Sequence, residues 1–269
     1  MTKPKRTPAA QTPGRRRGLA KPDLNSLLRH SLKETRTLLR SWDTAHQADT
    51  LHLARVAWRR HKCLLKFYQP LLSKPPLHDQ ATLQTVWKLT GQLRNLDVAL
   101  DSTLPAWLEA HPAMGGSEWQ LLLRRLRQER LHLSQDLALA LHTAAVKVAF
   151  RRLQRWTQRV DTASKGMTKK LFKPWAMQRL QRLHRKIRAH RHPISPERQH
   201  RGRLLLKQER YALESLLSKG RSKKLQKRLH RCRLQQTQQG HQQDLQMALN
   251  LITAFGRSPA LARAWQKTM

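Results

Sequence analysis

The chain has 269 residues and carries 54 Lys and Arg against 16 Asp and Glu, which gives a formal net charge of +38. Self-repulsion of this size disfavours the compact state of the free protein, so we expect a polyanion as partner: DNA, RNA, anionic lipid or inorganic polyphosphate. Two cysteines, Cys63 and Cys232, exclude a disulfide framework and fit a reducing compartment, so we expect a cytoplasmic protein in which both are small core residues.

The N-terminal segment is basic and rich in proline. Residues 1–22 contain four Pro and seven Lys and Arg and almost no large apolar side chain, which predicts a disordered basic tail. This segment has no apolar stretch of the kind that a secretory signal requires. The most apolar run, residues 137–150, is interrupted by His142 and Lys147 and is shorter than the roughly 20 residues of a membrane span, so we predict no span.

Residues 23–257 read as one continuous helical region. Asp23 is the expected N-cap of a first helix that extends to Trp42, and a second helix carries His52 and stops before Pro75. Further helices are predicted over 78–109 with a bend at Pro105, 118–144, 146–160, 175–190, a segment containing His200, and 223–255. Breaks are expected at 111–117, 161–174, 193–196 and 218–222, and residues 258–269 are expected to form a C-terminal tail. The fold class is therefore all-α.

Two of these helices carry a stripe of basic residues with the same spacing. Because each helical residue advances about 100°, offsets of 0, 3, 7, 10 and 14 fall on one narrow face. The first stripe consists of His52, Arg55, Arg59, Lys62 and Lys66, and the second of His200, Arg203, Lys207 and Arg210. Residues 49–72 contain no Glu that could compensate the first stripe, which favours an external anion as its partner.

The matched stripes indicate an internal duplication. Gly91 follows His52 by 39 residues and Gly240 follows His200 by 40. We therefore predict half-repeats over about 23–160 and 174–257, related by a pseudo-twofold that turns the stripes toward each other and forms a basic central groove or pore. Gly91 lies inside a predicted helix, where its cost of about 1 kcal/mol is expected to be offset by the close approach of another helix.

Residues for catalysis or metal binding are not apparent. The chain has no phosphate-cradling glycine motif, no closely spaced carboxylate cluster and no Glu-x-Glu-x-Lys run, so we expect no enzymatic activity. His184, His190, His192 and His200 stand among arginines whose charge opposes a cation, so no metal or other cofactor is expected. His52 and His200 could be buried histidines that bond backbone carbonyls, but their matched places beside arginines favour phosphate contact.

Four motifs resemble the signatures of the CHAD domain (conserved histidine α-helical domain) family. They are H-x-x-R-V-x-x-R-R-x-K at 52–62, G-Q-L-R-N-L-D-V at 91–98, H-x-x-R-x-x-x-K-x-x-R-Y-x-x-E at 200–214 and G-x-x-x-D-L at 240–245. The resemblance implies two four-helix bundles related by a pseudo-twofold, with a basic central pore that binds inorganic polyphosphate without catalysis. It also implies association with polyphosphate granules.

The resemblance implies a set of polyphosphate-binding residues by motif position, to which the first stripe adds Lys66. Lys33 and Arg36, on a separate face of the first helix, are further candidates. The main set is His52, Arg55, Arg59, Arg60, Lys62, Lys66, Arg94, His200, Arg203, Lys207, Arg210 and Tyr211.

The chain departs from the family pattern at several positions. Asn95 stands where Asp is common, so Arg94 could be freer or could be oriented by Asp97 instead. Gln208 stands where the family commonly has a basic residue. Two rival interpretations remain. One is a sequence-nonspecific nucleic-acid-binding protein that uses its charge and the basic tail, although stacking aromatics are sparse. The other is a helical scaffold whose charge directs it to acidic proteins or membranes.

Overall fold

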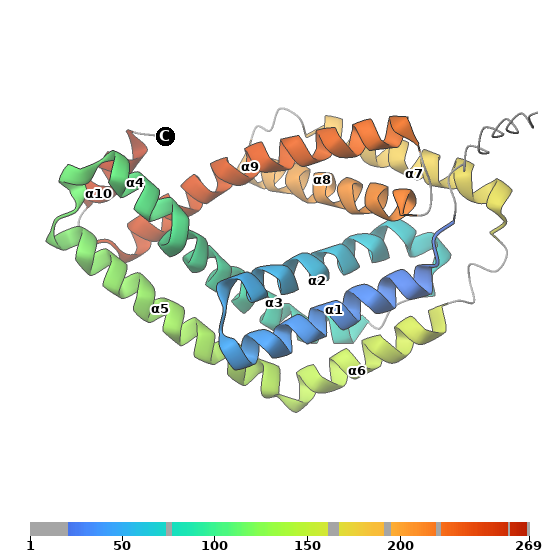
Figure 1. The fold of residues 1–269 in the computed structure, drawn as a ribbon, viewed down its shortest axis with the longest axis horizontal. Helices are drawn as coiled ribbons and strands as arrows, with labels where there is room; N and C mark the ends of the chain where they lie inside the picture. The colour runs from blue at the N-terminus through green and yellow to red at the C-terminus, as the bar shows by residue number, and fades with distance from the viewer. Residues whose placement is uncertain are drawn as a thin grey trace, which may run out of the picture.

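The computed structural model describes residues 21–73, 77–160, 167–190, 195–218, 222–257 and 259–267. Every regular element in this part of the chain is helical, which confirms the all-α class (Figure 1). Residues 1–20, 74–76, 161–166, 191–194 and 219–221 lie outside the described residues, together with the expectations for them. Residues 169–174 were expected to belong to a break but are helical. The α-helices are α1 (Leu24–Ala45), α2 (Ala48–Tyr68), α3 (Leu77–Val98), α4 (Leu104–Ala110), α5 (Ser117–His142), α6 (Ala144–Arg159), α7 (Lys169–Arg188), α8 (Pro196–Leu217), α9 (Lys223–Phe255) and α10 (Pro259–Gln266).

Short polar side chains set the helix starts. The Asp23 carboxylate accepts a hydrogen bond from the backbone N–H of Ser26, as predicted, and Ser195 and Ser222 cap α8 and α9 in the same way. The predicted helix over 78–109 is divided. A π-helical turn at Ala99–Thr103 follows α3, and Pro105 lies in the first turn of α4, where its missing N–H costs no hydrogen bond.

The buried side chains form two clusters, and three helices contribute to both. The first half of α2 adds Leu51 and Trp58 to one cluster, whereas its second half adds Leu64 and Phe67 to the other. Helix α9 adds Leu225 and Cys232 to the second cluster and Met247 to Ile252 to the first, and α1 is shared in the same manner. The clusters therefore do not divide the chain at the expected boundary between half-repeats, and the duplication itself stays a prediction.

The C-terminal residues correct one expectation. Most of the segment expected to be a tail forms α10, whose Leu261 and Trp265 are buried in the first cluster. The Trp265 ring packs 5.0 Å from that of Trp107. An isolated helix of this length is marginal in water, so its stability comes from packing against distant residues, which the local sequence does not reveal.

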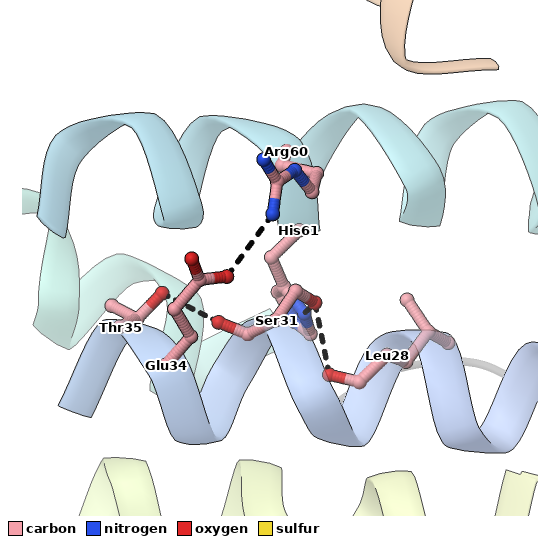
Figure 2. A network of polar contacts seen from close by, with 6 residues as sticks. All are labelled: Leu28, Ser31, Glu34, Thr35, Arg60 and His61. Atoms are coloured by element: carbon pink, nitrogen blue, oxygen red, sulfur yellow. Dashed lines mark hydrogen bonds and ion pairs between the residues drawn. The ribbon is translucent and has the colours of Figure 1, made fainter. Parts of the chain in front are cut away.

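A polar network joins α1 to α2 (Figure 2). The Ser31 hydroxyl lies 3.0 Å from Nδ1 of His61, which is fully buried, and Thr35 donates to the Ser31 carbonyl. Burial lowers the pKa of His61 to about 4, so this imidazole is neutral at pH 7. At the edge of the same interface, Arg60 donates to Glu34 at 3.1 Å.

Across the described ranges, no helix combines the length and apolarity needed to cross a membrane.

Candidate anion-binding cleft

Helices α2, α7 and α8 enclose a cleft lined by cations. Two adjoining pockets of about 760 Å³ each share Lys66, Lys186, Leu205 and Gln208, and together they form what we call the basic cleft. No carboxylate is among the described residues that line either pocket. The cationic lining consists of Arg55, Arg59, Lys62, Lys66, Arg179, Arg182, Arg185, Lys186 and Arg201.

The two predicted stripes come together because α2 packs directly on α8. Burial, with Arg59 and Arg55 from the other stripe and Arg203 and Arg210 from its own helix, lowers the pKa of Lys207 to about 8. Burial, with Arg59 and Arg94, likewise lowers the pKa of Arg55 to about 10. Both pKa values are lowered because like charges are held close together in partly desolvated surroundings. We call Arg55, Arg59, Arg94, Arg203, Lys207 and Arg210 the inner cluster.

Both stripe histidines are exposed, which removes the alternative of buried histidines satisfied by backbone carbonyls. The pKa of His52 is lowered first by partial burial and then by Arg94, Arg59 and Arg55. That of His200 is lowered by partial burial and by Arg203 and Lys207. Both rings are therefore mainly neutral at pH 7, and each has one N–H to donate. Their contact with phosphate stays a prediction.

Arg55 explains the glycine in α3, and the explanation differs from the expected one. Its guanidinium donates to the Thr90 hydroxyl at 2.9 Å and to the Trp87 carbonyl at 3.4 Å. A Cβ atom at position 91 would lie only 3.2 Å from Nη1 of Arg55. Gly91 thus leaves room for this side chain rather than for the close approach of a helix backbone.

Substituting Gly91 tests whether the position of the Arg55 guanidinium matters for polyanion binding. In a Gly91→Ala variant, we expect a stability within about 1 kcal/mol of wild type, because the gain in helix propensity offsets the crowding. The displaced guanidinium should weaken polyanion binding about three- to tenfold, which is the loss of part of one charge-assisted contact. Urea unfolding and a binding titration measure the two quantities. Unchanged affinity would show that the exact position of Arg55 is unimportant.

Arg94 belongs to the same electrostatic neighbourhood, but Asp97 is engaged elsewhere. Asp97 is fully buried and accepts a hydrogen bond from Nε of Arg130 at 2.7 Å. Burial raises the pKa of Asp97, while Arg130 and Arg94 act in the opposite direction. Burial raises the pKa of Asp244 in α9, whereas the charges of Arg94 and Lys207 act to lower it. The Asn95 side chain is exposed. Two carboxylates from different helices thus lie in the field of Arg94.

Arg60, Arg210 and Tyr211 lie beside the cleft and are partly engaged by other residues. The Tyr211 ring is buried, with the guanidinium of Arg210 4.4 Å and that of Arg60 6.0 Å from its centroid. Arg60 is paired with Glu34, and Nε of Arg210 lies 3.8 Å from Glu214, one helical turn away. Arg60 and Tyr211 therefore support the wall of the site more than they line it, whereas Arg210 also belongs to the inner cluster.

Lys33 and Arg36 do not join the basic cleft. They lie between α1 and α6, in two pockets that share Arg36 and Arg40 and that we call the α1/α6 furrow. Arg36 donates to the side chain of Gln154 in α6. The furrow and the cleft have no lining residue in common.

Several residues of the cleft were not predicted from the sequence. Trp58 and Trp87 stack on each other at 4.6 Å and form an apolar wall. Lys186 enters from α7, and His190 enters from the turn that follows this helix. Cys63 corrects an expectation, because it lines the cleft instead of belonging to a core cluster, and burial raises the pKa of its thiol to about 11. The dense cations of 179–191 were the available signal. The expected core position of Cys232 is confirmed.

Among the described residues, no group of three or more His, Cys, Asp or Glu is arranged to hold a metal ion. His184 lies 3.8 Å from Glu209, which is occupied by Arg228. His192 is outside the described part of the chain.

Comparisons with known proteins agree on the fold. The crystal structure of the CHAD domain from the plant Ricinus communis is 24% identical, with a TM-score of 0.75 over 96% of this chain and 86% of that one. PptA from Streptomyces chartreusis is 20% identical, with a TM-score of 0.66 over 90% of this chain and 89% of that one. No curated protein matches the chain. The family model of the CHAD domain matches residues 24–253, and the chain therefore belongs to the CHAD domain family.

Proposed function

We propose that the protein binds inorganic polyphosphate in the basic cleft and at the adjoining inner cluster, without catalysing a reaction on it. The observation that carries this proposal is the lining of the cleft, which gathers nine Lys and Arg from three helices and no carboxylate among the described residues. Membership of the CHAD domain family supports it. Such binding would also bring the protein to polyphosphate granules.

The free protein holds these cations at a cost that an anion removes. Burial and like charges lower the pKa of both Lys207 and Arg55, so their charged forms are destabilised without a ligand. A phosphate chain supplies charge-assisted hydrogen bonds to them and releases its own counterions. Arg offers a planar fork for phosphate oxygens, and Lys a mobile point charge.

The aromatic side chains of the cleft favour a polymer without bases. Trp58 is only 6% exposed, and its ring is stacked against Trp87 on one side and near His61 at 5.5 Å. Single-stranded nucleic acids are usually bound by aromatic rings whose faces are open to the bases. A chain of phosphates needs no such platform. The absence of carboxylates from the cleft lining also leaves no evident ligands for the metal ions on which phosphoryl transfer commonly depends.

The proposal is tested by titrating the protein with long-chain polyphosphate and with charge-matched single-stranded DNA at rising salt concentrations. We expect polyphosphate to bind more tightly at every salt concentration. A Lys62→Ala, Lys66→Ala, Arg182→Ala variant, which removes three exposed cations of the cleft, should weaken binding by tenfold or more, on the order of 1 kcal/mol per contact. The matched control removes three exposed cations elsewhere, Arg124, Arg127 and Arg263. Equal affinities for the two polymers, or equal losses in variant and control, contradict the proposal.

The pH dependence of polyphosphate binding should reflect the loss of the proton from the Lys207 side chain. Because its pKa in the free protein is about 8, the side chain is mostly protonated at pH 7 and mostly neutral at pH 9. A bound polyanion favours the charged form, so binding takes up a proton above pH 8 and affinity falls as the pH rises. We expect about three- to tenfold weaker binding at pH 9 than at pH 7. In a Lys207→Arg variant the dependence should be flatter over this range, and an identical profile would exclude Lys207 as its source.

A further inference from the structure

A second cationic track lies on α1 and α6, away from the basic cleft. Arg29, Lys33, Arg36 and Arg40 follow one another on α1 at intervals of four, three and four residues, which places them on one face over about 16 Å of helix. Lys147 and Arg151 extend this surface from α6. Two pockets of about 340 and 440 Å³ meet along the track. The only carboxylate among their lining residues is Asp43, which is paired with His142 at 2.8 Å.

One cation of this track is crowded by its neighbours. Arg36 is half-buried, whereas the other cations of the track are exposed. The pKa of Arg36 is lowered first by burial and then by Arg40 and Arg151, which belong to different helices. Helix–helix packing therefore holds Arg36 close to Arg40 and Arg151, and the one carboxylate among the described residues that line the furrow, Asp43, is already paired with His142. An anion in the α1/α6 furrow would relieve this repulsion.

The furrow and the basic cleft are separated by two packed helices. In Figure 1 the order from top to bottom is α8, α2, α1 and α6, and each of these helices packs on the next. The ion pair of Glu34 and Arg60 lies at the α1–α2 interface (Figure 2). Since Glu34 lies about 140° around α1 from Arg29, the acidic side chain faces away from the furrow and toward α2. One protein thus presents two separate polyanion tracks.

The floor of the furrow limits what can occupy it. Leu32 and Leu39 are 1% and 3% exposed, and Val146 and Phe150 are each 6% exposed. These side chains are already covered, so an amphipathic partner helix would find little apolar surface to bury. The nearly buried Phe150 ring offers no open face for a nucleic-acid base. A thin anionic chain without bases fits this shape and charge best.

We infer that the α1/α6 furrow binds a second polyphosphate chain, so that one protein molecule bridges two chains. This inference rests on the proposed function of the basic cleft and adds to it. A protein with two tracks can bind two polyphosphate chains at once and so gathers them into a network, whereas a protein with one track only coats them. Because the two tracks are linked, binding at one raises the effective concentration for the second binding event.

A sandwich assay tests the bridge. Polyphosphate is tethered to a surface, the full-length protein is bound to it, and end-labelled polyphosphate is then added from solution. We expect wild type to capture the labelled chain. A Lys33→Ala, Arg40→Ala, Arg151→Ala variant should keep its affinity for the tethered chain within about threefold and capture at least about fivefold less of the labelled one. Arg36 is left unchanged because of its bond to Gln154.

The controls distinguish failure of the bridge from failure of the cleft. If the furrow variant captures as much labelled chain as wild type does, the second track is refuted while the proposed function stands. If wild type does not bind the tethered chain, the proposed function itself is refuted. The Arg124→Ala, Arg127→Ala, Arg263→Ala control has the same net charge as the furrow variant. An equal loss of capture in this control would therefore show that the furrow does not bind the labelled chain specifically. Equal capture of labelled charge-matched DNA overturns the choice of polyphosphate.

Discussion

We expect an Arg59→Gln, Lys207→Met double variant to bind polyphosphate at least about a hundredfold more weakly than wild type, yet to melt at a higher temperature. Each substitution removes one charge-assisted contact, worth about 1.5–3 kcal/mol. The same charges oppose each other in the free protein, because Arg59 is the principal cationic neighbour that lowers the pKa of Lys207. Removing them relieves repulsion, and a gain of about 1 kcal/mol would raise the melting temperature by about 2–4 °C.

Affinity and thermal stability must be measured on the same preparations. Isothermal titration gives the first and calorimetric melting without ligand the second. The Arg124→Ala, Arg127→Ala variant serves as control and should change both quantities little, since both side chains are exposed on α5. If the double variant binds polyphosphate as tightly as wild type does, the inner cluster is not part of the binding site. One that binds weakly and also melts early shows that these cations maintain the fold instead.

Replacing Arg228 with Met should destabilise the protein by about 3–5 kcal/mol, which is the usual cost of leaving a buried charge without its partner. Arg228 donates to the Glu209 carboxylate and to the Leu180 carbonyl at 2.9 Å, so it ties α9 to α8 and α7. Glu209 is only 2% exposed. Its other basic neighbour, His184, lies 3.8 Å away and compensates only in part.

Urea unfolding of a double-mutant cycle measures this coupling. Adding Glu209→Gln to Arg228→Met should recover part of the loss, because the unpaired charge is gone. Arg233→Met on the same helix is the matched control. Its pair with Glu214 is exposed, with 58% of the Arg233 side chain accessible, and its loss should cost no more than about 1 kcal/mol. A cost below 1 kcal/mol for Arg228→Met would mean that Glu209 finds another partner or is protonated.

Features with a local physical cause could be predicted from the sequence. Leucine periodicity and the Asp23 cap give the first helix, and the predicted limits of α9 agree with the structure. The repeated spacing of His52 to Lys66 and His200 to Arg210 identified two helix faces whose cations do come together. A stripe can be predicted because 3.6 residues per turn fixes its geometry within one helix.

The remaining features depend on how distant segments meet. Helix α10 is too short to predict alone and is stabilised by the packing of Trp265 on Trp107. The approach of α7 and of the turn after it adds Lys186 and His190 to the cleft, although the sequence showed only that this segment is basic. Lys33 and Arg36 were correctly placed on a separate face, but the sequence could not indicate that this face meets α6. Gly91 was marked as unusual, and only the structure identifies Arg55 as its reason.

The sharing of helices between the two buried clusters affects how the protein unfolds. Because α1, α2 and α9 each run through both clusters, neither cluster can lose its packing without exposing part of a helix that the other requires. The described chain should therefore melt in one cooperative transition, and fragments cut between α6 and α7 should fail to fold separately. The basic cleft lies on α2, one of these shared helices, so a ligand that braces α2 protects both clusters from unfolding at once.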